Sequence, residues 1–192
     1  SYYFTDEVKV EIILHIDEQR IRETDQTADV DNFAKCILDC IKGKKGILID
    51  DCQIQSLHLS WIDIYDEHEW FEGEVRGHPD EFLLRDVCLY EMPDGLWYPL
   101  SNHTWDAGES KPLDEISEIS GPLILDAMTD FSRKLRAKLR DAGLNRVKAY
   151  REARYHATGA RGFHKSRVEG DFDLITLKEW RAKIVELEEK GD

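Results

Sequence analysis

The chain has 192 residues, 41% hydrophobic residues and a formal net charge of −14. This length suits one sizeable domain, or a core with an appended unit, and the composition excludes a disordered or fibrous protein. No apolar run reaches membrane-spanning length and no signal peptide is visible, so we expect a cytoplasmic protein without a membrane partner.

The first predicted element is a strand followed by an acidic turn. Hydrophobic residues occupy every second position from Val8 to Ile16, a period of two that is typical of a strand. The stretch Asp29-Val30-Asp31-Asn32 follows, and Asp31 or Asn32 is predicted to cap the next helix by accepting hydrogen bonds from its first turn.

A helix is predicted from Asn32 to Ile41. Its apolar residues recur at three- and four-residue spacing, which indicates one buried face. The members of that face are Phe33, Cys36, Ile37, Cys40 and Ile41. The two cysteines are therefore expected to be reduced core residues, and no pair of CxxC units is present to hold zinc.

A second acidic turn, Asp50-Asp51, precedes another predicted strand, Gln53 to Ile64, in which hydrophobic and polar residues alternate. The order is strand, acidic turn, helix, acidic turn, strand, and we expect the two acidic turns to meet at one end of the sheet. Because gathered carboxylates repel one another, such a cluster usually has a cation to neutralise it. The pattern predicts a divalent-metal site.

These residues carry a family resemblance. The pattern Asp-x-Asp-Asn-x-x-Lys-x-x-x-Asp from Asp29 to Asp39, followed by Asp-Asp-x-Gln-Ile from Asp50 to Ile54, resembles the RusA family of Holliday junction resolvases. The resemblance extends roughly from Val8 to Trp61. It implies an α/β fold, a small mixed β-sheet packed with helices, to which this chain adds a helical C-terminal region. It also implies a homodimer that nicks two strands of a four-way DNA junction with Mg²⁺, for which Mn²⁺ is a substitute.

The resemblance further assigns roles to single residues. It implies catalytic roles for Asp29, Asp31, Lys35 and Asp51, and metal binding by Asp29, Asp31, Asp50 and Asp51. Mg²⁺ prefers carboxylate oxygens, and it polarises a phosphate and lowers the pKa of an attacking water. A plainer interpretation is that Asp29 and Asp31 cap a helix while Asp50-Asp51 form an ordinary turn.

The chain departs from the family in three ways. It opens without the usual proline-containing segment, its residues 17–25 mix acids with two arginines in place of a basic run, and it continues far beyond the matched region. Junction specificity therefore stays open, with flaps or forks as other substrates. The alternative function is a catalytically silent module with a RusA-like fold that binds DNA structures or another protein.

The middle of the chain predicts short strands between Trp70 and Tyr98, and a long loop or domain boundary from Ser101 to Ser120. We expect a RusA-like catalytic core over 1–105 and a mainly helical extension over 106–192, packed on the core or swapped with it. The histidines show no metal-ligand spacing. The run from Leu174 to Glu189 is predicted to be an amphipathic helix.

The net charge is unevenly distributed. Between Ser132 and Arg167 there are twelve Lys or Arg residues and two acids, a local balance of +10 that leaves −24 for the rest of the chain. Such asymmetry favours one surface that meets a polyanion, because basic side chains supply most non-specific affinity for DNA. The predicted phosphate contacts are Arg133, Lys134, Lys138, Arg161, Lys165 and Arg167.

This basic segment is predicted to contain the end of a helix with an apolar stripe from Leu123 to Leu139, a second helix from about Asn145 to His156, and a mobile, glycine-rich linker from Thr158 to Lys165. The alternative is a basic helical pair that packs against the protein's own acidic surface.

Overall fold

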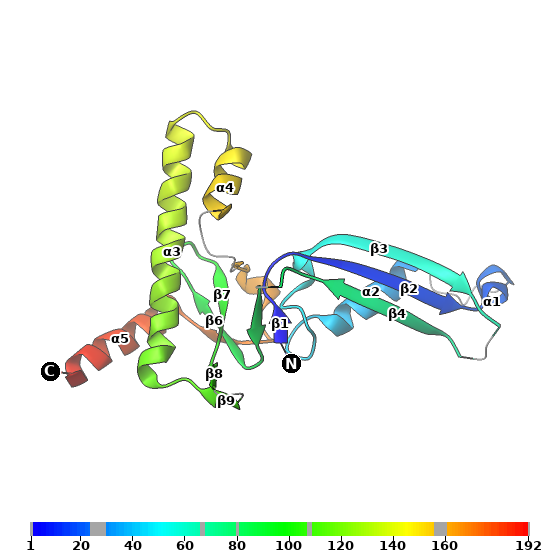
Figure 1. The fold of residues 1–192 in the computed structure, drawn as a ribbon, viewed down its shortest axis with the longest axis horizontal. Coiled ribbons are helices and arrows are strands. Elements are labelled where there is room, and N and C mark those ends of the chain that lie inside the picture. The colour runs from blue at the N-terminus through cyan, green and yellow to red at the C-terminus, as the bar shows by residue number, and fades with distance from the viewer. Residues whose placement is uncertain are drawn as a thin grey trace. The chain divides into compact units, whose positions relative to one another are not determined.

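The computed structural model describes residues 2–23, 30–65, 68–79, 81–106, 109–155 and 161–191. The chain forms two compact units. We call Tyr3–Phe82 the N-terminal unit, and Ser1–Tyr2 with Leu83–Asp192 the C-terminal unit. The short strands β1 (Tyr2–Phe4) and β5 (Phe82–Leu84) contain residues of both units. The fold class is mixed α/β, as the sequence predicts (Figure 1).

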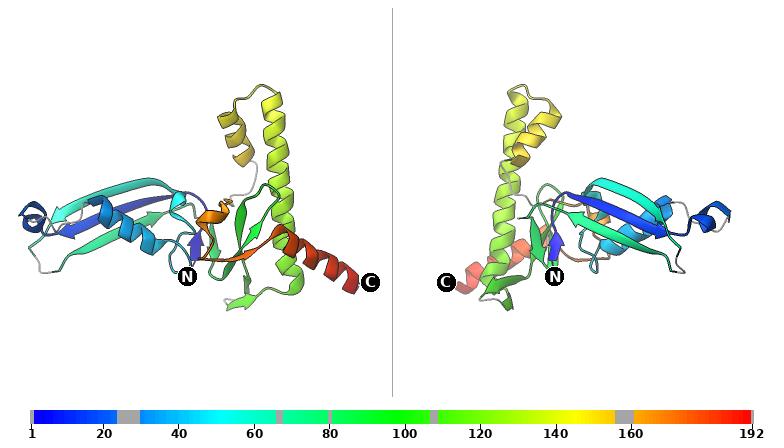
Figure 2. Two further views of the ribbon diagram at one scale, coloured as in Figure 1. Left: turned by 180° about the vertical axis from the view of Figure 1, so that it is seen from behind. Right: turned by 45° about the vertical axis from the view of Figure 1, so that its right-hand side comes forward.

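A three-stranded sheet forms the centre of the N-terminal unit, in the order β3-β2-β4. The central strand β2 (Val8–Ile16) runs parallel to β3 (Ile54–Asp63) and antiparallel to β4 (Trp70–Arg76). Parallel neighbours need a crossover connection, and this one contains α1 (Glu18–Glu23), α2 (Val30–Ile41) and the 3₁₀ turn η1 (Asp51–Gln53). Figure 2, seen from behind, shows α2 along one face of the sheet.

The core of the N-terminal unit lies between α2 and β2. Every second residue of β2, from Val8 to Ile16, is buried, which confirms the strand that the alternation predicts. Side chains of α2 pack against this row: Val30, Phe33, Ile37, Leu38 and Ile41. Since each buried β2 side chain leaves water, this contact is the main hydrophobic stabilisation of the unit.

Two details of the predicted helix are wrong. The helix begins at Val30, so Asp31 and Asn32 lie inside its first turn and neither is the cap. Cys36 and Cys40 are exposed rather than buried. The reason is that the buried face runs through Val30 and the residues three to four positions apart from it, which turns both cysteines toward solvent.

The connection from α2 to β3 turns sharply at two glycines. Gly43 has a φ of 73°, the left-handed conformation that ends helices. The carbonyl of Ile41 then accepts hydrogen bonds from Ile47 N at 2.8 Å and Leu48 N at 2.9 Å. A Cβ atom on Gly46 would lie 2.1 Å from that same carbonyl oxygen, so only glycine fits there.

The C-terminal unit contains a second three-stranded sheet, in the order β10-β6-β7. Strand β6 (Val87–Glu91) is antiparallel to β7 (Trp97–Ser101) and parallel to β10 (Asp173–Ile175). Helices α3 (Glu115–Asp141), α4 (Arg146–Tyr155) and α5 (Leu177–Gly191) complete the unit, with the 3₁₀ turn η2 (Lys165–Arg167). Its core gathers Tyr90, Met92, Tyr98, Leu125 and Trp180.

Three expectations for this unit need correction. The segment from Ser101 to Ser120 is not a loop: it holds the hairpin of β8 (His103–Asp106) and β9 (Glu109–Pro112) and the start of α3. The last helix begins at Leu177 rather than Leu174, because Leu174 pairs with β6.

The third correction concerns the predicted mobile linker. Residues 156–160 lie outside the described part, but Phe163 is buried and exchanges two backbone hydrogen bonds of 2.8 Å with Trp97. The residues around Phe163 are therefore fixed to β7. Among the described helices, none combines the length and the apolar character needed to cross a membrane.

Candidate active site

One face of α2 carries a row of alternating charges. Asp31, Lys35 and Asp39 are four residues apart and exposed, and Lys42 follows directly after the helix. Asp31 lies in the first turn, where the helix dipole favours a negative charge. At about 1.5 Å per residue, Asp31 and Asp39 are about 12 Å apart along the helix axis. The row therefore spreads its carboxylates along the helix.

The second acidic turn places its two aspartates in different surroundings. Asp50 is buried and caps η1, and its carboxylate accepts a hydrogen bond from Cys52 N at 3.0 Å. Asp51 is half-buried, and its Oδ2 lies 3.0 Å from Lys42 Nζ. The Asp51 carboxylate thus contacts the Lys42 side chain, and the Asp50 carboxylate holds the backbone of the turn.

Gln53 fixes this turn from inside the unit. It is fully buried, and its Oε1 accepts hydrogen bonds from Ile49 N at 2.7 Å and Asp50 N at 3.1 Å. Its Nε2 donates to the carbonyls of Phe4 at 2.8 Å and Asp6 at 3.0 Å. All four hydrogen-bonding positions of the amide are used. The glutamine of the motif is therefore a structural clamp for the turn that carries Asp51.

Lys42 joins the two charged groups. Its Nζ lies 2.9 Å from Asp39 Oδ1 as well as 3.0 Å from Asp51 Oδ2. The hydrogen bond from Lys42 lowers the pKa of Asp39, and the hydrogen bonds to Asp39 and then Asp51 raise the pKa of Lys42. Sequence reasoning did not single out Lys42, although its position three residues after Asp39 is the spacing of a helical ion pair.

The prediction that the two acidic turns meet at one end of the sheet is wrong for the described residues. Val8, at the start of β2, pairs with Ile54, at the start of β3. Asp51 precedes β3 and so lies near this end, whereas Asp31 lies in the first turn of the helix that runs back from the other end of β2. The chain must return along the sheet before a parallel strand starts, which separates the two turns.

The carboxylates of the motif are suitable ligands for a hard divalent cation, but those that the structure describes do not surround a common point. Carboxylate oxygens are the ligands that Mg²⁺ prefers. Within the described ranges, no three His, Cys, Asp or Glu side chains are grouped so that they could hold a metal ion. Asp29, the first predicted ligand, lies outside those ranges. Asp31, Asp50 and Asp51 are placed, and each has different surroundings.

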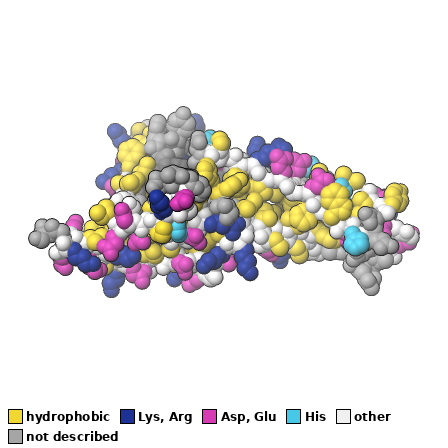
Figure 3. All heavy atoms as spheres, turned by 60° about the horizontal axis from the view of Figure 1, so that its bottom comes forward, with side chains coloured by type: hydrophobic (Ala, Val, Ile, Leu, Met, Phe, Trp, Pro, Cys, Tyr) yellow, Lys and Arg dark blue, Asp and Glu magenta, His cyan; other side chains and the backbone are white. Residues whose placement is uncertain are grey.

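The predicted phosphate contacts belong to the C-terminal unit and fall into two groups. Arg133 and Lys134 both pair with Asp130, at 2.7 and 2.6 Å, and together lower its pKa. Lys165 lies 3.6 Å from Glu169. Figure 3 shows the same mixing, with dark-blue basic and magenta acidic side chains next to one another on the face it presents.

The remaining three basic candidates have other surroundings. Lys138 and Arg167 are exposed, on α3 and on η2. Arg161 is half-buried, with its guanidinium 6.0 Å from the centre of the Phe163 ring. A phosphate can therefore reach both Lys138 and Arg167.

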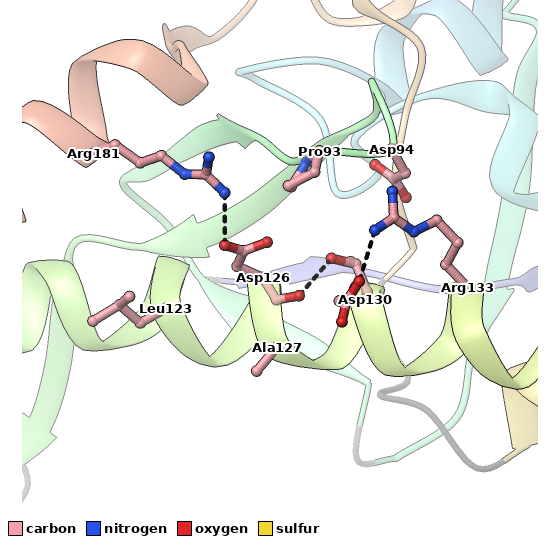
Figure 4. Close-up of a pocket in the computed structure, with 9 residues that line it drawn as sticks. Pro93, Asp94, Leu123, Asp126, Ala127, Asp130, Arg133 and Arg181 are labelled. Carbon is pink, nitrogen blue, oxygen red and sulfur yellow. Dashed lines mark hydrogen bonds and ion pairs between the residues drawn. The ribbon is translucent and has the colours of Figure 1, made fainter.

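A pocket of about 470 Å³ lies in the C-terminal unit beside α3 (Figure 4). Its charged lining is already paired: Arg181 binds Asp126 at 3.0 Å, and Arg133 binds Asp130. Asp94, also in the lining, accepts a hydrogen bond of 2.8 Å from the Tyr98 hydroxyl. These carboxylates form ion pairs and a hydrogen bond within the unit, and none of the residues that line the pocket belongs to the motif.

Comparison with known proteins identifies the motif-bearing segment. Residues 2–74 match the family described as Endodeoxyribonuclease RusA. The match confirms the resemblance seen in the acidic motif, and it includes β2, α2, η1, β3 and most of β4. No curated protein and no solved structure matches the chain.

Proposed function

We propose, from the RusA endodeoxyribonuclease domain at residues 2–74, that the protein is a Mg²⁺-dependent endonuclease that resolves four-way DNA junctions by paired nicks. The observation that carries this proposal is that the family match contains the whole motif from Asp29 to Gln53. Asp29, Asp31, Lys35 and Asp51 are the proposed catalytic residues, and Asp50 joins the aspartates as a proposed metal ligand.

The structure supports a division of labour within the motif. Asp31 and Lys35 are exposed on α2, where a phosphate can reach them. A fixed ammonium such as that of Lys35 stabilises charge that develops on a phosphate in the transition state. Gln53 holds the turn that presents Asp51, so its contribution to the reaction is to position that carboxylate. Asp50 caps the same turn in addition to its proposed role as a metal ligand.

DNA binding is proposed for the basic part of the C-terminal unit. Its net charge of +10 between Ser132 and Arg167 favours contacts with DNA phosphates, whereas the rest of the chain carries a net charge of −24. We further propose a homodimer, because two nicks related by the two-fold symmetry of a junction suit a two-fold protein.

One observation favours the second candidate, a catalytically silent module that binds DNA structures. Lys42 pairs with Asp51 and Asp39, and the described carboxylates do not surround a common point. A protein that only binds DNA has no need to free Asp51 from its ion pair.

Cleavage of a labelled synthetic junction separates the two candidates. The protein is incubated with a four-way junction or a linear duplex of the same sequence, in Mg²⁺, Mn²⁺ or EDTA. A nuclease nicks the junction in either metal, spares the duplex and loses cleavage in Asp31→Asn while still binding. Binding without nicking in any metal supports the silent module, and equal cutting of the duplex overturns junction selectivity. Cleavage of a flap or a fork in preference identifies a different branched substrate.

A further inference from the structure

Lys42 lies between two carboxylates at the end of α2. Its Nζ is 2.9 Å from Asp39 Oδ1 and 3.0 Å from Asp51 Oδ2, and its side chain is 30% exposed. Asp51 is one of the proposed catalytic residues of the motif, whereas Lys42 and Asp39 have no role in the proposed reaction. The ammonium is therefore a cation that the chain itself supplies to one of its proposed metal ligands.

The backbone on both sides of this contact is anchored. Lys42 pairs with Leu48 through an isolated parallel bridge, and the Ile41 carbonyl next to it accepts two backbone hydrogen bonds. On the other side, Gln53 holds the turn before β3 with four hydrogen bonds. The ion pair thus joins two fixed backbone segments of the N-terminal unit.

A divalent cation at Asp51 would compete with this ammonium. Both need the carboxylate oxygens, and two cations at neighbouring positions repel each other most strongly where water is partly excluded. Metal binding at Asp51 must therefore displace Lys42 or tolerate it nearby. Either outcome weakens the binding of the metal.

We propose that Lys42 is a positioning residue that holds Asp51 in the metal-free protein and lowers the affinity of the motif for divalent cations. This inference rests on the proposed function, because it takes Asp51 as a metal ligand. It explains why Asp51 is paired with a lysine in this structure although the family depends on a metal.

Direct measurement of Mn²⁺ binding tests this inference without any cleavage assay. Free Mn²⁺ is followed by electron paramagnetic resonance in titrations of the full chain, its Lys42→Met variant and its Lys42→Arg variant. Loss of one neighbouring positive charge is expected to tighten Mn²⁺ binding by about tenfold in Lys42→Met. The arginine variant keeps the charge and should bind Mn²⁺ as the unchanged chain does. Adding Asp51→Asn to Lys42→Met should remove the gain.

Lys9→Met is the matched control. Lys9 is exposed and lies on β2 in the same unit, on the face that points away from α2, and its replacement removes the same charge. Its Mn²⁺ affinity should stay within about twofold of the unchanged chain, since salt screens charges that are exposed to water. An equal gain in Lys9→Met would overturn the inference, as would unchanged, weaker or absent Mn²⁺ binding in Lys42→Met.

A second variant protects the test against misfolding. Lys42→Gln keeps a hydrogen-bond donor between Asp39 and Asp51 but carries no charge, and it should also tighten Mn²⁺ binding. Thermal unfolding of every variant shows which ones are folded. Tighter Mn²⁺ binding without junction cleavage would support the role of Lys42 and reject the nuclease. Junction cleavage by the unchanged chain, together with an unchanged Mn²⁺ affinity in Lys42→Met, would support the nuclease and reject the role of Lys42.

Discussion

The side-chain oxygen of Gln53 accepts the backbone N–H of Ile49 at 2.7 Å, across the turn that carries Asp50 and Asp51. The same amide reaches the carbonyls of Phe4 and Asp6 from its other end. One buried side chain thus connects the start of the N-terminal unit to the proposed catalytic turn.

Replacing Gln53 with alanine should destabilise the N-terminal unit by about 3 kcal/mol, because it leaves several buried backbone groups without partners. Urea denaturation followed by tryptophan fluorescence measures the change. Gln55→Ala, at an exposed position of β3, is the control and should change stability by less than about 0.5 kcal/mol. Equal effects of the two substitutions would contradict the clamp.

Trp180 should be the corresponding anchor of the C-terminal unit. It is 2% exposed and its indole N–H donates to the Glu91 carbonyl at 2.9 Å. Trp180→Ala should cost about 3–5 kcal/mol, the range for a large buried aromatic residue. Calorimetry compares it with Val185→Ala, an exposed position on the same helix that should shift stability by less than about 0.5 kcal/mol. A stable Trp180→Ala protein would show that this core is packed differently.

The ion pair of Asp39 and Lys42 predicts a pH dependence with a definite sign. The hydrogen bond from Lys42 holds the pKa of Asp39 below its ordinary value of 3.8. A depressed carboxyl pKa contributes stability above pH 3.8, and this contribution is lost as the pH falls through the folded-state value. The pKa of Lys42 is raised above 10.5, so its contribution is fully present below pH 10.5 and is lost as the pH rises through the higher folded-state value.

Carbon-13 NMR titration of the aspartate carboxyl groups measures this effect. In Lys42→Met the pKa of Asp39 should rise toward its ordinary value. Asp114, whose pKa is lowered by its hydrogen bonds with Ser117, is an internal control that should not respond. A normal Asp39 pKa in the unchanged protein would mean that the ion pair does not persist in solution.

Phosphate binding by the C-terminal unit predicts a graded response to salt. Replacing exposed Lys138 or Arg167 with glutamine should reduce the slope of log affinity against log salt by about 0.9 for each lost contact. Arg133→Gln should have a smaller effect than Lys138→Gln, since the Arg133 guanidinium already binds Asp130. Fluorescence anisotropy with a labelled junction gives these slopes. Unchanged slopes in all three variants would show that DNA does not bind to this part of the C-terminal unit.

Much of the N-terminal unit could be predicted from its sequence, because its signals are local. The alternation from Val8 to Ile16 and the spacing of Phe33, Ile37 and Ile41 each predict one element, and both elements are present. The position of the two acidic turns depends on the parallel pairing of β2 with β3, a non-local relationship. That pairing separates Asp31 from Asp51, and no single motif reveals it.

The errors in the C-terminal unit have a similar origin. Strands β8 and β9 consist largely of polar residues, so the hairpin has no hydrophobic alternation by which to recognise it. Leu174 fits the periodicity of the following helix, yet pairing with Leu89 makes it a strand residue. In both places pairing with another strand determines the secondary structure, and the local sequence pattern does not predict it.

Resolution of a cruciform extruded from a supercoiled plasmid tests the central claim most directly, since paired and unpaired nicks give different products. With Mg²⁺, the protein is predicted to convert the cruciform plasmid to linear DNA and to leave a plasmid without the inverted repeat intact. Asp51→Asn and EDTA should each abolish the linear product. Nicked circles alone, or equal cutting of both plasmids, would contradict a junction resolvase.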